Sequence, residues 1–176
     1  MPLSPDLACR TLSAWVASAV GLMWLALGVG CAHNDPQNLP PSATTAAVEQ
    51  HMGKPTMILP RPAAGSRWVF AKGPYGRHTW MLDMDASGRL ESWHQALGEA
   101  QFSELPAGLD RDALLFRLGP PADKRARGLM PGEVWSYRYP TNNCLWFQVT
   151  LGPDHKVVDG SYGIDPRCDA PTKAGD

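Results

Sequence analysis

The side chains best suited to acid–base or metal chemistry are scattered along this chain. Its histidines are His33, His51, His78, His94 and His155, and no two have the spacing that places ligands on one helical face. No glycine-rich phosphate loop, nucleophile elbow or zinc-protease motif occurs in the sequence. We therefore expect no catalytic residue, no metal site, no cofactor and no enzyme activity. A Ser-His-Asp set gathered from separate loops is the alternative, because such triads are defined by geometry in space.

One stretch imitates the start of a calcium-binding loop. Residues 83–91 read Asp-Met-Asp-Ala-Ser-Gly-Arg-Leu-Glu, with oxygen ligands at alternate positions and Gly88 at the sixth. A calcium loop of this kind has a bidentate Glu at its twelfth position, whereas this chain has His94 there. The flanking residues read as strands, so a hairpin turn is the favoured interpretation.

The amino end has the pattern of an export signal. Residues 11–30 are almost free of charge, Arg10 precedes them, and small residues lead into Cys31. A basic flank, an apolar core and a small-residue exit are typical of a secretory signal. A permanent membrane helix is the alternative, because the apolar run is about as long as a bilayer requires.

The exit of this signal, residues 1–30, resembles that of bacterial lipoproteins, in which the cysteine is acylated and becomes the first residue. Gly28 occupies the position where the usual pattern has Leu, and Leu27 stands one place early. The resemblance implies lipidation of Cys31, and Ala32 after it implies sorting to the outer membrane. An ordinary signal peptidase could use the same small residues instead. Residues 31–43 would then form a lipid anchor and a proline-rich flexible tether.

Two cysteines remain in the mature body, Cys144 and Cys168. An even pair in an exported chain favours a disulfide, which would attach the tail, residues 166–176, to the start of a strand. A metal site is the alternative, although two thiols without a nearby pair of histidines make poor ligands.

Composition excludes one class of partner. The formal net charge is -1 and the pI about 6.5, so we expect no nucleic-acid binding, which would need a clustered basic surface. Seven tryptophans in 176 residues indicate strand packing for most of them, with partner contact as the alternative for the rest.

The second half of the mature chain repeats the pattern of the first. Residues 48–55 resemble residues 114–121 at an offset of 66, and later apolar positions match at an offset of 67, as Trp68 does with Trp135. One inserted loop residue explains the change of offset. We therefore expect two tandem units, at residues 44–97 and 108–165, joined by a connector at 98–107.

Each unit is expected to place a helix or helix pair on a three-stranded antiparallel meander, which is an α+β fold. In the second unit Asp110 can cap a helix that ends at Gly119, and three strand-like runs follow. In the first unit Thr44 or Thr45 caps, and Gly53 ends the helix. The loops between helix and strands, residues 57–66 and 122–132, are each expected to hold one short helical turn.

The second unit carries a series of motifs in order: Gly108 and Asp110, Leu118-Gly119-Pro120-Pro121, Val134-Trp135-Ser136-Tyr137, Phe147-Gln148-Val149 and a strand from Val157. This series resembles the SmpA/OmlA (BamE-like) family of outer-membrane lipoproteins. The resemblance implies two helices against a three-stranded sheet and a non-enzymatic role in assembling outer-membrane barrels. The chain departs from the family by carrying two units and the cysteine pair. The tandem also resembles beta-lactamase inhibitor proteins, which build a concave binding surface from two related units.

These observations predict a non-catalytic outer-membrane lipoprotein that acts as an envelope scaffold or assembly accessory. Its expected partners are an envelope protein, the barrel-assembly machinery being the first to test, and the membrane through acyl chains on Cys31. Tyr75, Arg77 and Trp93 are the residues expected to contact the partner. The alternatives are a periplasmic inhibitor-like or ligand-binding module that uses the cleft between the units, and a hydrolase.

Overall fold

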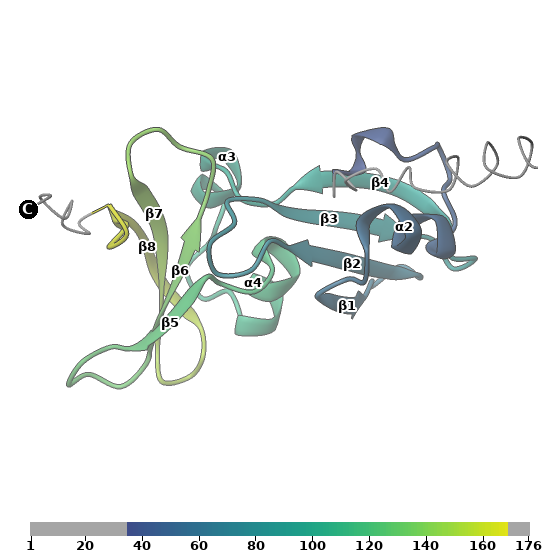
Figure 1. Cartoon of the computed structure of the whole chain (residues 1–176). Helices are drawn as coiled ribbons and strands as arrows, with labels where there is room; N and C mark the ends of the chain where they lie inside the picture. The colour runs from purple at the N-terminus through teal and green to yellow at the C-terminus, as the bar shows by residue number, and fades with distance from the viewer. Residues whose placement is uncertain (1–34, 169–176) are drawn as a thin grey trace, which may run out of the picture. The chain divides into compact units, whose positions relative to one another are not determined.

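The computed structural model describes residues 35–168, so the expected signal at 1–30, the expected lipidation site Cys31 and the end of the tail lie outside the described residues. The α+β class expected from the sequence is confirmed, with more strand than helix. The described residues form two four-stranded antiparallel sheets, in the orders β1-β2-β3-β4 and β5-β6-β7-β8 (Figure 1). Below, the first half means residues 35–96 and the second half residues 97–168. No helix of residues 35–168 is long and apolar enough to cross a membrane.

The first half begins with a short 3-10 helix, η2, and the helix α2, and continues with the first sheet. Their bounds are η2 Pro36–Asn38, α2 Thr45–Met52, β1 Met57–Pro60, β2 Ser66–Ala71, β3 Thr79–Met84 and β4 Leu90–Gln95. Alternation along β2 sends Trp68 and Phe70 to the face that packs with Val48 and Met52 of α2. Val69 lies on the opposite face in a second apolar cluster. Both faces of this sheet are therefore buried in part.

The second half contains two helices and the second sheet. Their bounds are α3 Glu99–Ser103, α4 Arg111–Leu118, β5 Asp123–Ala126, β6 Glu133–Arg138, β7 Leu145–Leu151 and β8 Val157–Ile164. One apolar core joins Phe102 of α3 and Leu114 of α4 to Trp135 and Phe147 of the sheet. The Phe102 and Phe147 rings stack with centroids 4.2 Å apart. Both helices therefore cover the same face of the second sheet.

The helices α2 and α4 begin and end much as their sequences predict. The Thr44 hydroxyl accepts a hydrogen bond from the Ala47 amide, and α2 ends at Gly53 with a φ of 80°. The helix α4 ends at Gly119 with a φ of 76°. Asp110 stands at the N-cap position of α4 but makes no side-chain cap, and its carboxylate lies 3.4 Å from the Lys156 ammonium.

Three expectations from the sequence were wrong in detail. Each sheet has four strands instead of three, since β1 and β5 occupy loops that were expected to hold a helical turn. The connector at 98–107 contains α3, which contributes Phe102 to the second core. Part of the expected flexible tether, residues 35–43, holds η2 and buries Pro36. This segment packs on the rest of the first half, since Ala43 belongs to its core and His51 Nε2 lies 2.9 Å from the Asp35 carbonyl oxygen.

Elements of the second half follow those of the first at a nearly constant offset. The helices α2 and α4 begin 66 residues apart, and the strands β2 and β6 begin 67 residues apart. The β3–β4 pairing shifts register between Asp83 and Met84, and the β7–β8 pairing shifts between Thr150 and Leu151, again 67 residues later. Matched irregularities are informative because a bulge adds one residue at a defined place in a strand.

Candidate functional site

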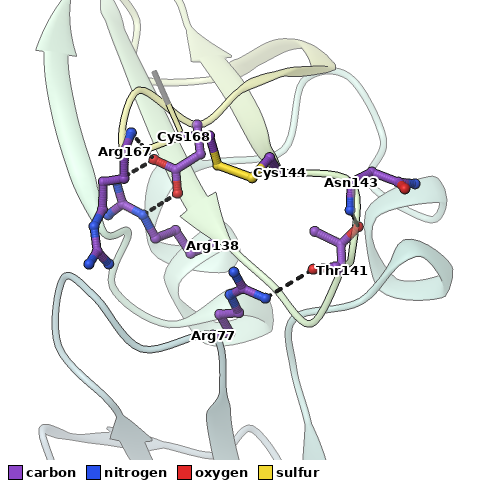
Figure 2. Close-up of a disulfide and its surroundings, with 8 residues drawn as sticks. Arg77, Arg138, Thr141, Asn143, Cys144, Arg167 and Cys168 are labelled. Atoms are coloured by element: carbon purple, nitrogen blue, oxygen red, sulfur yellow. Dashed lines mark hydrogen bonds and ion pairs between the residues drawn. A yellow bond between two sulfur atoms is a disulfide. The ribbon is translucent and has the colours of Figure 1, made fainter. Parts of the chain in front are cut away.

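The Cys144–Cys168 disulfide expected from the sequence is present in the structure. The two Cα atoms are 6.1 Å apart, and the cysteines are separated by 24 positions in the chain (Figure 2). Cys144 directly precedes β7, and its carbonyl oxygen also accepts a hydrogen bond from the Asp165 amide at 2.9 Å. The segment that follows β8 is therefore held to the start of β7 by one covalent and one hydrogen bond.

A buried arginine lies beside this disulfide (Figure 2). Arg138 donates through Nε and Nη2 to the two carboxylate oxygens of Asp165, at 2.5 and 2.8 Å. Its Nη1 donates to the carbonyl oxygen of Pro74, in the β2–β3 hairpin of the first half. The hydrogen bonds from Arg138 lower the pKa of the Asp165 carboxyl below its ordinary value, against the opposing effect of burial. Arg138 therefore joins a carboxylate of its own half to the backbone of the other half.

A second arginine makes the same kind of connection in the opposite direction. Arg67 donates to both carboxylate oxygens of Asp83, at 2.7 and 2.8 Å, and through Nη1 to the carbonyl oxygen of Phe116 in α4, at 2.9 Å. Its guanidinium carbon also lies 4.0 Å from the centroid of the Phe116 ring. Burial alone would raise the pKa of the Asp83 carboxyl, but Arg67 and Arg61 lower it below its ordinary value. Arg67 and Arg138 thus each form a bidentate ion pair within their own half. Each also donates one further hydrogen bond to a backbone carbonyl of the other half.

Tyr75 and Arg77, which the sequence predicted as partner contacts, lie in the β2–β3 hairpin close to the second half. Arg77 Nη1 donates to the Thr141 carbonyl oxygen at 3.0 Å (Figure 2). The Tyr75 ring lies 4.5 Å from the guanidinium carbon of Arg167, and 69% of the residue remains exposed. The hairpin therefore contacts its own chain, and Tyr75 keeps a large accessible surface.

Trp93, the third predicted contact, lies on β4 in a different surface. Its ring packs edge to face on Trp80, with centroids 5.5 Å apart, and 38% of the residue is exposed. A shallow hollow of about 660 Å³ lies beside it. This Trp93 hollow is lined by Leu39, Pro40, Pro41, Ser42, Asp85, Arg89, Leu90, Glu91, Ser92 and Trp93. It combines an aromatic edge, prolines and charges of both signs.

A smaller hollow of about 280 Å³ lies between the halves. The lining residues are Arg67, His94, Gln101, Glu104, Arg117 and Leu118. Burial, followed by the charge of Arg67, lowers the pKa of the His94 imidazole. A neutral imidazole can accept or donate a hydrogen bond, so this inter-half hollow presents polar groups to a small ligand.

The calcium-like stretch forms a closed hairpin turn. One Asp85 carboxylate oxygen accepts from the Ser87 amide, the Ser87 hydroxyl and the Arg89 amide, at 2.8, 2.7 and 2.8 Å. Asp83, two residues earlier, is paired with Arg67. Both carboxylates therefore already have partners within the chain.

One further surface was not predicted from the sequence, the outer edge of β8. This eight-residue strand is the last in its sheet and pairs only with β7 over most of its length. Val158, Tyr162 and Ile164 are exposed apolar residues on it. The strand contains Gly160 and Gly163 but neither Lys nor Pro, the residues that commonly protect edges, and that composition is the signal that could have indicated it.

Comparisons with known proteins do not assign the chain to a family. No protein-family model matches it, and no curated protein matches it. One similar crystal structure is that of a DUF4309 family protein, YjgB, from Bacillus subtilis subsp. subtilis strain 168, with 13% identity over 73% of this chain and 83% of that one, at a TM-score of 0.27. Another is an extracellular protein containing an SCP domain from Bacillus anthracis strain Ames, with 11% identity over 72% of this chain and 45% of that one, at a TM-score of 0.28. At these scores neither similarity supports an argument about fold or function.

Proposed function

We propose that the protein is a non-catalytic lipoprotein of the bacterial outer membrane that faces the periplasm and binds an envelope protein. The observation that carries this proposal is the Cys144–Cys168 disulfide, which follows an amino end with the pattern of an export signal. Disulfides persist in oxidising compartments such as the periplasm and are rare in the cytosol. Acyl chains on Cys31 would supply the anchor, since each buried methylene contributes about 0.8 kcal/mol.

The Trp93 hollow is the surface we assign to partner binding. Trp93 is partly exposed, and its ring already packs on Trp80. Such a side chain offers a large contact area and loses little conformational freedom on binding. Trp93 is held by Trp80 behind it, so its ring is already oriented. Tyr75 is a second contact, because most of its surface is accessible. Arg77 contributes mainly by holding the β2–β3 hairpin through Thr141.

We also propose that the two halves are related copies of one unit, similar to the SmpA/OmlA family with a strand added to each sheet. The constant offset of helices and strands, and the two matched register shifts, support this relation. The distance from Gly53 to Gly119 would be the length of one repeat, because Gly53 ends α2 and Gly119 ends the matching helix α4. An experimental structure in which residues 44–97 fail to superpose on residues 108–164 would contradict the duplication.

Cross-linking in outer membranes tests the binding function. Cells that express the full chain are treated with a cross-linker, and the protein is recovered with its partners and identified by mass spectrometry. We expect envelope proteins to be recovered, with barrel-assembly components as the first to check. Trp93→Ala is expected to reduce that recovery, whereas Leu129→Ala, which removes a fully exposed side chain from the β5–β6 hairpin, is the matched control. Equal recovery with both variants would reject the Trp93 hollow.

Membrane attachment is tested separately by cell fractionation. Cys31→Ala is expected to release the protein into the soluble periplasm, since the acyl chains would be absent. Unchanged retention in the membrane would instead indicate that residues 11–30 remain as an uncleaved helix.

The inter-half hollow supports a second candidate function, binding of a small ligand or an inhibitor-like role. Its polar lining and the neutral imidazole of His94 favour this reading. Recovery of a periplasmic enzyme, lost in His94→Ala and kept in Trp93→Ala, would favour it over the scaffold role.

A further inference from the structure

The outer edge of β8 carries backbone groups that lack partners among the described residues. Near its start the edge is covered, because the Gly108 amide donates to the Val157 carbonyl oxygen at 2.7 Å and the Val157 amide donates to Leu109 at 2.8 Å. Within residues 35–168, no hydrogen bond reaches the outer side of β8 beyond that point. An edge strand with open donors and acceptors is a template for another extended chain.

The pairing with β7 identifies which groups are open. The Asp165 amide donates to the carbonyl oxygen of Cys144, and these two residues are one position beyond the Leu145–Ile164 pair, so they continue the ladder as a hydrogen-bonded pair. In an antiparallel ladder, hydrogen-bonded pairs alternate with pairs whose amides and carbonyls point away from each other. Ile164, Tyr162 and Gly160 therefore direct their N–H and C=O groups to the outer side. Three consecutive outward positions are enough to bind several residues of an extended backbone.

A cavity with a mixed lining of apolar and polar groups lies beside this same edge. It measures about 300 Å³ and is lined by Phe102, Ser103, Leu105, Phe147, Val149, Val157, Asp159, Gly160 and Tyr162. Gly160 allows the Phe147 ring to pack directly against β8, since a Cβ at that position would lie 2.5 Å from Cζ of Phe147. Residues opposite each other on paired strands point to the same face. A chain paired with β8 would therefore direct the side chain opposite Gly160 to the face of the sheet on which this cavity lies.

The charge beside the cavity is negative. Asp159 is the charged residue among those that line it. Glu99 of α3 lies close enough to Tyr162 to contribute, after burial and Tyr139, to raising the pKa of its hydroxyl. A basic residue next to the apolar one in the bound chain would complement these carboxylates.

Two other edge strands carry residues that hinder such pairing. β1 has Pro60 at its end, and β5 carries Lys124 and Arg125. Proline and charged side chains are the usual protection of an edge strand. β8 has neither a proline nor a basic side chain, so its edge has less of this protection than β1 and β5.

We propose that the outer edge of β8 binds an extended segment of another protein by strand addition. The segment places an apolar side chain, such as Phe, in the cavity beside Gly160 and a Lys or Arg beside Asp159. This inference rests on the proposed function as a protein-binding module and adds a second contact surface, separate from the Trp93 hollow, with the chemistry of the segment it binds. A second copy of this chain, paired edge to edge, is the competing occupant.

The test uses the full-length chain, purified with its disulfide intact, and a synthetic peptide of about nine residues, the length of a long strand. The peptide alternates Thr and Val, with one central Phe between two Lys residues. We expect the peptide to bind and to slow hydrogen exchange at the amides of Gly160, Tyr162 and Ile164, as followed by NMR. A peptide with N-methyl groups on alternate residues is expected to bind at least about tenfold more weakly, since its backbone donors are lost. Replacing Lys by Glu is expected to weaken binding several-fold.

Two proline variants make a matched pair on the protein. Ile164→Pro removes an outward N–H from β8 without breaking a bond to β7, and edge strands tolerate such prolines. Ile58→Pro makes the same change on β1, where the Arg61–Gly65 bond and the register place Ile58 outward as well. We expect binding to fall at least about fivefold in the first variant and to stay unchanged in the second. Equal binding by both variants, or by the N-methylated peptide, would overturn the proposal.

The remaining outcomes are also decisive. Exchange protection at β8 that grows with protein concentration and without peptide, together with a doubled mass in sedimentation, would replace the peptide partner by a second copy. Because the peptide assay uses purified protein, its failure would remove strand addition while leaving attachment by Cys31 and recovery of envelope partners intact. Conversely, peptide binding by a chain that recovers no envelope protein would retain the β8 edge and reject the proposed role in binding an envelope protein.

Discussion

The Arg138 guanidinium donates a hydrogen bond to the carbonyl oxygen of Pro74, across the junction between the two halves of the described chain. The same guanidinium is paired with Asp165, which is 8% exposed. Asp165 in turn bonds the backbone of Cys144, and the Cys144–Cys168 disulfide closes the same segment. Ion pair, disulfide and hairpin therefore stabilise one another at this end of the junction.

Arg138→Ala is expected to destabilise the fold by about 3–5 kcal/mol, because it leaves the Asp165 carboxylate buried without its partner. Urea unfolding followed by tryptophan fluorescence measures the change. Arg77→Ala is the control, since Arg77 makes an exposed hydrogen bond across the same junction, and its cost is expected to stay below about 1 kcal/mol. Similar losses in the two variants would show that burial of the Arg138–Asp165 pair is not what matters.

Gly119→Ala is expected to cost more than Gly53→Ala, although both glycines end a helix with similar backbone angles. A Cβ at Gly119 would lie 2.9 Å from Cγ2 of Thr79 and 3.1 Å from Cγ1 of Val69, whereas a Cβ at Gly53 meets nothing within 4 Å. Backbone strain costs about 1–3 kcal/mol in each variant, and crowding adds about 1–3 kcal/mol in the first alone. The difference in free energy of unfolding therefore reports the packing of α4 on the first sheet. Equal costs would mean that this contact is loose in solution.

The parts of the fold that local chemistry determines were predictable from the sequence. Thr44 and Gly53 mark the ends of α2, and the alternation of Trp135 and Tyr137 marks a strand, since caps and period-two patterns are local signals. The strand β5 was missed because Asp-Lys-Arg-Ala has no apolar alternation and forms only by pairing with β6. A strand that depends on such pairing cannot be predicted from the composition of a short polar segment.

The candidate site was less predictable than the fold. The Cys144–Cys168 pair could be expected from cysteine counting. The contacts between the halves could not be predicted. Arg67 and Phe116 are 49 positions apart, and nothing in the sequence shows that the Arg67 guanidinium contacts both the Asp83 carboxylate and the Phe116 carbonyl oxygen. The open edge of β8 depends in the same way on which strand ends the sheet, which is a property of topology.

Removing the disulfide by Cys144→Ser with Cys168→Ser is expected to lower the free energy of unfolding by about 3 kcal/mol, the loop-closure value for a cross-link between residues 24 positions apart. Thermal unfolding with and without a reductant measures it. The reductant is expected to lower the Tm of the parent chain and to leave the double variant unchanged. A double variant as stable as the oxidised parent would show that the Asp165 network alone holds the segment.

Acid is expected to destabilise the protein through the paired carboxylates. The pKa values of Asp83 and Asp165 lie below their ordinary values in the folded state, so the unfolded state binds more protons as the pH falls. Their contribution to stability is present above the unfolded pKa of about 3.9 and is lost as the pH falls through it towards the lower folded values. Burial lowers the pKa of His94 in the folded state, so this residue adds to the loss of stability from about pH 6.5 downward. The variant His94→Gln measures how much of the loss is due to His94. Urea unfolding between about pH 7 and 3 measures the profile.

Asp165→Asn is expected to be less stable than the parent at neutral pH. It is expected to lose less free energy of unfolding on acidification, since one of the two carboxylates no longer titrates. Parallel pH profiles for the parent and this variant would contradict the role given to the Arg138–Asp165 pair.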